Sequence, residues 1–242
     1  MMPSEKRITR ENALDVIKQF AKEYRKELGK VPGEIIIVGG GSIMLNYGFR
    51  DATQDFDVIL KTVSGIRDVI ARFADEQGLP ADWMNSDFMK TASYSDRLAE
   101  VSRHYCSLNN NTLEVRTVSG IYLIAMKLRS HREYRNDISD ICGVMLEEAE
   151  RGNHFGEKEI ADAYRYLYGE APDTAQAEIV AQLCTQDPGE LKKIFERRSH
   201  EEKRIGSKIV SYIEDGAAIN TKNVDEVIAK MKRKMEENGQ ER

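Results

Sequence analysis

The chain has 242 residues, of which 40% are hydrophobic and 32% are charged, and its net charge is −5 at pH 7. These values describe a folded chain of one or two domains and exclude a low-complexity or disordered one. The acidic balance argues against a general nucleic-acid coat, although local basic patches stay open. The charged stretch 1–20 has no apolar centre, and no apolar run is long enough to cross a bilayer. We therefore expect no signal peptide and no membrane partner.

The cysteines and histidines indicate neither a disulfide framework nor a zinc site. Cys106, Cys142 and Cys184 are far apart, odd in number and outside any CxxC pair. The four histidines show no ligand spacing. Because isolated thiols are typical of a reducing compartment, we expect a cytoplasmic protein.

Apolar spacing predicts alternating helices and strands in the first part of the chain. Residues 10–29 have the pattern of an amphipathic helix that ends at Gly29. The next expected elements are a strand at 35–38, a short helix at 42–47, a strand at 56–60 and a helix that begins at Ser64.

The second part of the chain predicts a hairpin and then helices alone. Residues 80–100 give no clear pattern. The segments 101–108 and 112–118 flank Asn109–Asn111, which is typical of a hairpin turn. Helical spacing follows from Ser119, then at Ile138, Ile141 and Met145, and then in segments broken at Ala171-Pro172, Asp187-Pro188 and Gly216. We therefore expect an α/β domain over 1–155 and an all-helical domain over 156–242.

The stretch 35–60, IIIVGGGSIMLNYGFRDATQDFDVIL, carries the main functional signal. A P-loop is excluded because no lysine follows the glycines. A dinucleotide-binding turn would need glycine where Met44 stands, and an acid at the end of the second strand rather than at its start. A tight turn beside two solvent-facing aspartates is the plain structural alternative. It explains the glycines, which tolerate positive φ, better than it explains Asp55 and Asp57.

A metal and phosphate site explains both halves of this stretch. Residues two apart in a strand face the same side, so Asp55 and Asp57 should point together while Phe56 faces the core. Two neighbouring carboxylates repel each other unless a cation lies between them, and Mg²⁺ or Mn²⁺ prefers such oxygen ligands. The backbone N–H groups of the glycine turn could hold a phosphate. Nucleotidyl transfer requires this combination.

The same residues resemble a known superfamily. Gly41-Ser42, followed after twelve residues by Asp55-Phe56-Asp57, resembles the GS…DxD signature of polymerase-β-type nucleotidyltransferases. The segment 48–57 resembles the R-x-x-T-x-D-x-D run of the AbiEii-like toxin and abortive-infection branch. The segments 122–128 and 135–140 resemble the later Lys…Arg…Asp-x-x-Asp segment of that branch. The resemblance covers about residues 30–150 and implies an α/β (α+β) fold, with a nucleotidyltransferase-like mixed sheet flanked by helices.

The resemblance also implies an activity, which is transfer of an NMP from an NTP to a hydroxyl with Mg²⁺ or Mn²⁺ as cofactor. The implied acceptor is a tRNA end or a protein hydroxyl, and a toxin role would add a cognate antitoxin as partner. The expected catalytic residues are Asp55, Asp57, Lys127 and Asp137. The expected nucleotide-binding residues are Gly40, Gly41, Ser42, Arg50 and Thr53. The expected metal ligands are Asp55, Asp57 and, as a third carboxylate, Glu114, with Asp137 and Asp140 as alternatives.

Several alternatives stay open at this point. Glu114 could be a solvated strand residue, and Lys127 a surface lysine. The chain could be a nucleotide- or partner-binding module without activity, or a dinucleotide-dependent oxidoreductase. Residues 190–212 hold seven basic and four acidic residues, and this run either grips RNA phosphates or forms a solvated helix face. A last helix is expected from the apolar spacing of Val224, Val227, Ile228, Met231 and Met235.

Overall fold

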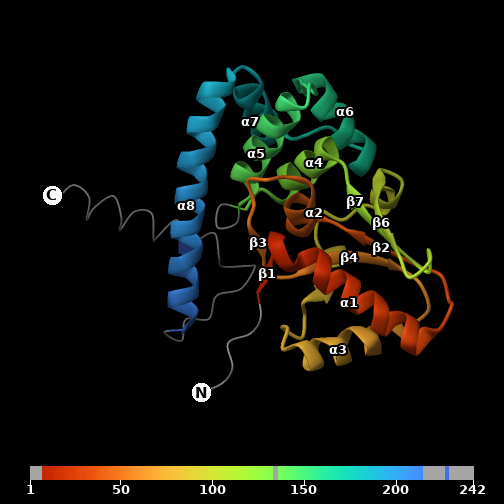
Figure 1. Ribbon diagram of the computed structural model, residues 1–242. Helices are drawn as coiled ribbons and strands as arrows, with labels where there is room; N and C mark the ends of the chain where they lie inside the picture. The colour runs from red at the N-terminus through yellow and green to blue at the C-terminus, as the bar shows by residue number, and fades with distance from the viewer. Residues whose placement is uncertain (1–6, 133–135, 215–226, 229–242) are drawn as a thin grey trace.

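A mixed β-sheet between two layers of helices forms the centre of the protein (Figure 1). The computed structural model describes residues 7–132, 136–214 and 227–228. Within this part of the chain the sheet has five strands in the order β5-β4-β2-β7-β6. Their bounds are β2 Gly33–Ile37, β4 Phe56–Lys61, β5 Met84–Asn85, β6 Ser102–Leu108 and β7 Leu113–Val118.

The central strand β2 runs antiparallel to β4 and parallel to β7. Ile37 is opposite Val58 on one side and opposite Thr117 on the other. Because successive side chains alternate between the two faces of a strand, Ile35 and Ile37 pack into one hydrophobic layer and Ile36 into the other. The sheet is therefore covered on both faces, which explains why the run at 35–38 is apolar throughout.

One face of the sheet is covered by α1 (Arg10–Leu28) and α3 (Ile66–Gln77) (Figure 1). Thr9 and Asn12 form a capping box that starts α1. Edge-to-face ring contacts join Phe20 of α1 to Phe73 of α3 and to Trp83, with centroid distances of 5.6 and 5.5 Å. Such pairs contribute about 1 kcal/mol each beyond the area that they bury.

The other face of the sheet is covered by helices from the second half of the chain. Ile36 and Val38 share a hydrophobic core with these helices, so the core is continuous from the sheet to the C-terminal segment. α8 lies against α5 (Figure 1), and the predicted domain boundary at residue 155 stays a prediction. The helices are α4 Gly120–Ser130, α5 Asp137–Glu150, α6 Glu157–Tyr168, α7 Thr174–Cys184 and α8 Pro188–Glu214.

The predicted mixed α/β class and the main helices and strands are confirmed, with one informative difference. Helix α2 spans Gly39–Asn46, so it begins three residues before the predicted start at Ser42. The glycines therefore form the first turn of the helix. The short elements that were not predicted are β1 Ile8–Thr9, β3 Ala52–Thr53, β5, and the 3-10 turns Asp87–Lys90 and Asp96–Ala99.

The remaining expectations concern the C-terminal segment, membrane-spanning helices and the cysteines. The predicted break at Gly216 and most of the predicted helix at 224–235 lie outside the described residues. Ile228 is described, and it is buried against Ile205 and Ile209 of α8. Within the described part of the chain, no helix is both long and apolar enough to span a bilayer. The three cysteines are free thiols.

Candidate functional site

The glycine turn lies directly after β2, at the N-terminus of α2. Gly39 has φ +55°, a conformation that side chains other than glycine rarely adopt. The preceding residue, Val38, has an apolar side chain and so cannot cap the helix. The first N–H groups of a helix have no intrahelical acceptor, and they carry the positive end of the helix dipole. The turn is therefore suited to an anion such as a phosphate.

Asp57 borders this turn. The N–H of Val38 donates a hydrogen bond of 2.9 Å to the Asp57 carbonyl, which joins the end of β2 to β4. A β-carbon added at Gly39 would lie 3.6 Å from Oδ2 of Asp57. Phe56 and Val58 are fully buried in the core, so the half-buried Asp55 and Asp57 point to the opposite side. The structure thus brings Asp57 to the predicted turn, and Asp55 faces the same side of the sheet.

Two polar side chains hold Asp55 in place. Asn85 donates a hydrogen bond of 2.9 Å from Nδ2 to Oδ2 of Asp55. Thr53, which is buried, donates from Oγ1 to the backbone carbonyl of Asp55 at 2.9 Å. Thr53 was predicted to bind nucleotide, and in the structure its hydroxyl orients the chain at Asp55. Asn85 is not among the site residues predicted from the sequence, because it lies in the stretch 80–100 that has no clear pattern.

Arg50 connects the glycine turn to α5. Its guanidinium packs so closely on Gly40 that an added β-carbon there would lie 2.6 Å from Nη2. Nη1 of Arg50 forms an ion pair of 2.5 Å with Oδ2 of Asp140. The Arg50 side chain is 17% exposed. Arg50 is therefore a cation placed against the turn where a phosphate would bind.

Lys127 lies in a buried cluster of charges between α4 and α5. Its Nζ is 2.9 Å from Oδ1 of Asp137 and 2.7 Å from Oδ2 of Asp140. Asp137 also accepts hydrogen bonds from the backbone N of Arg132 at 2.9 Å and from its Nε at 3.2 Å. Burial by itself would raise the pKa of Asp137, but the charges of Lys127 and Arg132 outweigh it and lower that pKa to about 2.

The contacts in this cluster bear on the predicted role of Lys127, which is to bind nucleotide phosphates. Lys127 is 7% exposed, so it is not a surface lysine. Its positive charge is balanced by two carboxylates, one of which it shares with Arg50. The link to the glycine turn thus runs through Asp140 and Arg50. Direct contact between Lys127 and nucleotide phosphates stays a prediction. Arg135, which belongs to the same predicted motif, lies outside the described residues.

Ser42 is fully buried and its hydroxyl is already engaged. The Oγ atom donates to the carbonyl of Val118 at 3.3 Å and accepts from the N–H of Val118 at 3.0 Å. These bonds fix α2 to the end of β7. The structure therefore shows Ser42 as a link between two elements, and a phosphate would reach its hydroxyl only if these bonds broke.

Glu114 is not brought to Asp55 and Asp57. Through the register of β2, Glu114 and Lys61 are both opposite Glu34, which places Glu114 four residues from Asp57 along the sheet. That separation is about 13 Å at the rise of a strand. Glu114 instead contacts Arg116 at 3.1 Å. Among the described residues, no group of three or more His, Cys, Asp or Glu side chains could hold a metal.

The donors at the sheet edge still fit a hard divalent cation. Mg²⁺ commonly takes one or two carboxylates from the protein and fills its other positions with water and substrate phosphates. Asp55 and Asp57 supply two carboxylates beside a turn suited to phosphate. The arrangement thus fits a metal that binds together with a nucleotide, and it does not fit a metal held by the protein alone.

Comparison with known proteins identifies the family. A family model described as "Nucleotidyltransferase of unknown function" (DUF6036) matches residues 12–151. The matched range contains the glycine turn, Asp55, Asp57, Arg50 and the Lys127 cluster. No curated protein and no solved structure gives a match. The matched range is more than half of the 242 residues, and the chain therefore belongs to this nucleotidyltransferase family.

Proposed function

We propose that the protein is a metal-dependent nucleotidyltransferase, which transfers an NMP from an NTP to a hydroxyl acceptor with Mg²⁺ or Mn²⁺ bound at Asp55 and Asp57. One observation carries the proposal. The carboxylate of Asp57 borders the N-terminal turn of α2, and Asp55 faces the same side of the sheet. This geometry supports a cation site at the two carboxylates, beside a phosphate site at the helix N-terminus. The family match supports the same reaction class.

The residues of the site have separate roles in this proposal. The N–H groups of Gly40 and Gly41 and the guanidinium of Arg50 bind the phosphates and fix their orientation. Thr53 and Asn85 hold Asp55 in position. The bound metal would supply charge stabilisation at the phosphates and a more acidic acceptor hydroxyl.

The bond changes of the reaction follow from the substrate. The acceptor hydroxyl loses its proton to solvent and its oxygen forms a bond to the α-phosphorus, while the bond from that phosphorus to the bridging oxygen of the β-phosphate breaks. Pyrophosphate leaves with the electron pair of the broken bond. Lys127 and Asp137 support this chemistry by keeping Asp140, and through it Arg50, in place. Positioning and charge therefore account for most of the proposed catalysis.

The acceptor and the biological role rest on the sequence resemblance to AbiEii-like proteins. On that basis the acceptor is the end of an RNA such as tRNA, or a protein hydroxyl, and the protein acts as a toxin beside a cognate antitoxin. The basic run at 190–212 lies entirely on α8. It contains internal ion pairs such as Lys193–Glu190 at 2.5 Å. These pairs favour a solvated helix face over an RNA-binding surface.

A second candidate is a binding module of the same fold without activity. The observation that favours it is the position of Glu114, which leaves the acid pair without a third carboxylate among the described residues. Such a module would bind NTP and metal and transfer nothing.

Transfer of label separates the two candidates. Wild type and Asp55→Asn are each incubated with Mg²⁺, total RNA or cell lysate, and each α-labelled NTP in turn. The proposal predicts a labelled RNA or protein product with wild type, and a loss of at least about 100-fold in the variant, because the metal loses a charged ligand. NTP binding by wild type without any labelled product would support the binding module.

A further inference from the structure

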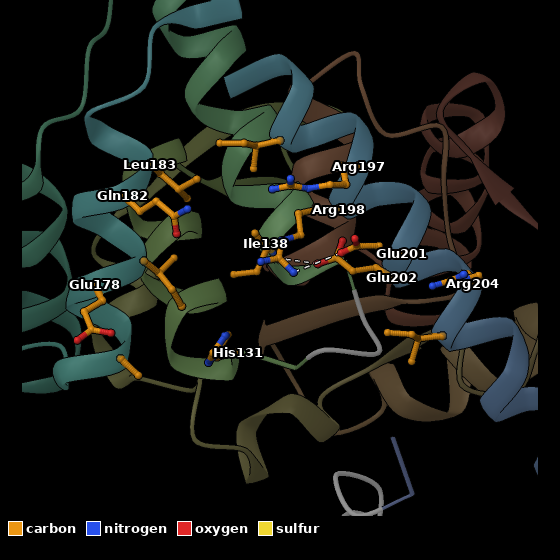
Figure 2. A pocket seen from close by; sticks show the side chains of 14 residues that line it. His131, Ile138, Glu178, Gln182, Leu183, Arg197, Arg198, Glu201, Glu202 and Arg204 are labelled. Carbon is orange, nitrogen blue, oxygen red and sulfur yellow. Dashed lines mark hydrogen bonds and ion pairs between the residues drawn. The ribbon is translucent and has the colours of Figure 1, made fainter. Parts of the chain in front are cut away.

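Glu202 of α8 reaches the N-terminus of α5 from outside the family-matched range. Its Oε1 accepts hydrogen bonds from the backbone N of Ile138 at 3.0 Å and of Ser139 at 3.4 Å. These partners are 64 and 63 residues away in sequence. Glu202 is only 5% exposed. Figure 2 shows Glu202 of α8 beside Ile138 of α5.

The hydrogen bonds fall on the turn of α5 that carries the charge cluster. The first N–H groups of a helix need acceptors from outside the helix, and a negative charge there also interacts well with the dipole. Asn136, at the N-cap of α5, makes no capping bond with its side chain. Glu202 supplies the missing cap. Asp137 and Asp140 are in the same turn, and they bind Lys127 and Arg50.

The position of this turn therefore decides where Arg50 lies. Asp140 holds Nη1 of Arg50 at 2.5 Å, and the other end of the guanidinium packs on Gly40. If the first turn of α5 frays, Asp140 moves and Arg50 loses the partner that holds it against the glycine turn. A short chain of contacts thus runs from Glu202 through the first turn of α5, which holds Ser139 and Asp140, to Arg50.

We infer that Glu202 is a positioning residue for nucleotide binding, which acts by fixing the first turn of α5 and through it the guanidinium of Arg50. The inference rests on the proposed function. It gives α8, which follows the family-matched range, a part in the nucleotide site, although Glu202 itself need not touch the nucleotide.

The surroundings of Glu202 argue against a role in stability alone. Its second oxygen, Oε2, is buried and has no hydrogen-bond partner among the described residues. The side chain also lines a cavity of about 650 Å³, between α7, α8 and the start of α5. A buried carboxylate with one unpartnered oxygen destabilises a fold, and burial accordingly raises the pKa of Glu202. Residues that cost stability in this way are often kept for function.

Three variants test the inference, with Mg²⁺·NTP binding by calorimetry, the KM and kcat of transfer, and the melting temperature as readouts. Glu202→Ala removes the cap. Glu202→Gln keeps an oxygen that can accept from Ile138 and Ser139. Glu201→Gln is the matched control, because Glu201 is the adjacent carboxylate, is 39% exposed and pairs with Arg198 instead of α5.

Glu202→Ala should weaken Mg²⁺·NTP binding about 10-fold and raise KM to match, with kcat changed less than about twofold. Glu202→Gln should restore binding to within about threefold of wild type, and Glu201→Gln should equal wild type. A folded Glu202→Ala variant that melts lower but binds NTP as wild type does would overturn the inference, since that pattern means a structural role alone.

A variant that fails to fold is replaced by Glu202→Asp, which keeps the charge but is one methylene too short to reach both N–H groups. The same weakening is expected there, and wild-type binding by Glu202→Asp would overturn the inference. Failure of the proposed function gives a different result. In that case wild type itself would not bind any NTP in the presence of Mg²⁺, and the inference would fall with it.

Discussion

Two pairs of aspartates differ in their burial and in the side chains that bind them. Asp137 and Asp140, on α5, are buried and form ion pairs with Lys127, Arg132 and Arg50. Asp55 and Asp57, at the edge of the sheet, are half-buried, and the side chain that binds the Asp55 carboxylate is the neutral amide of Asn85.

The difference separates carboxylates whose charge is balanced deep inside the protein from carboxylates that solvent and a ligand can reach. A buried carboxylate is tolerated only with a compensating charge, and the α5 pair has its cations inside the protein. A half-buried pair beside the glycine turn is open to a cation from solvent, as the proposed function requires. In the proposed function, the α5 pair therefore supports the site and the sheet-edge pair is its reactive part.

The largest expected effect comes from breaking the buried cluster. Lys127→Met keeps the length of the side chain but removes its charge, and it leaves Asp137 and Asp140 buried with fewer cations. We expect the free energy of unfolding to fall by about 3–5 kcal/mol, measured by denaturant titration. Lys158→Met is the control, because Lys158 forms a 2.6 Å ion pair with Asp162 while 85% exposed.

Such a surface pair contributes at most about 1 kcal/mol. Equal losses from Lys127→Met and Lys158→Met would mean that the buried cluster is not a support of the fold.

The next largest expected effect is the pH dependence of the stability of the fold. Burial raises the pKa of Glu202 to about 7 from an ordinary value of 4.5. Between these values the folded protein binds a proton that the unfolded chain has lost, so stability falls as pH rises through this window. The full shift corresponds to about 3 kcal/mol as an upper bound. Other charged groups at the same cavity or beside Glu202 are His131, Asp140, Glu178, Arg197, Arg198, Glu201 and Arg204.

Glu202→Gln removes this titration and should therefore be more stable than wild type at pH 8 and similar to it at pH 5. Chemical unfolding at both pH values measures the difference. A variant that is less stable than wild type at pH 8 would show that the ionised carboxylate stabilises the fold.

The smallest expected effect is a change in NTP binding caused by a substitution in the glycine turn. In Gly40→Ala the new β-carbon would lie 2.6 Å from Nη2 of Arg50, so the guanidinium must move. We expect NTP binding to weaken about 10-fold, or about 1.4 kcal/mol, with little change in stability because the end of a long side chain can shift. Calorimetry with Mg²⁺·NTP measures it, and Gly65→Ala, at the start of α3, is the control. Unchanged binding would remove Arg50 from the proposed site.

The local parts of this account were predictable from sequence. Strand alternation placed Asp55 and Asp57 on one side, away from Phe56, and helical spacing found α1, α4 and α5. Partners distant in the chain were not predictable. Ser42 pairs with Val118, 76 residues away, and Arg50 pairs with Asp140, 90 residues away.

Glu114 shows the same limit within a strand. Alternation correctly put Glu114 on the side opposite Leu113 and Val115, which are buried in the core. The position of Glu114 along the sheet depends on the register between β7 and β2, and that register cannot be read from a single sequence. Glu202 is a further case, because its cap on α5 joins segments that no local pattern connects.

Thermal unfolding of wild type and Asp55→Asn, with and without Mg²⁺ and each NTP, tests the central claim most directly. We expect Mg²⁺ and the correct NTP together to stabilise wild type, by about 2.7 kcal/mol at a ligand concentration 100 times the dissociation constant. Asp55→Asn should show no such gain, and without metal it should be no less stable than wild type, because repulsion with Asp57 is relieved. A variant that is destabilised without metal, yet gains as much from Mg²⁺·NTP as wild type does, would contradict the claim and make Asp55 part of the scaffold.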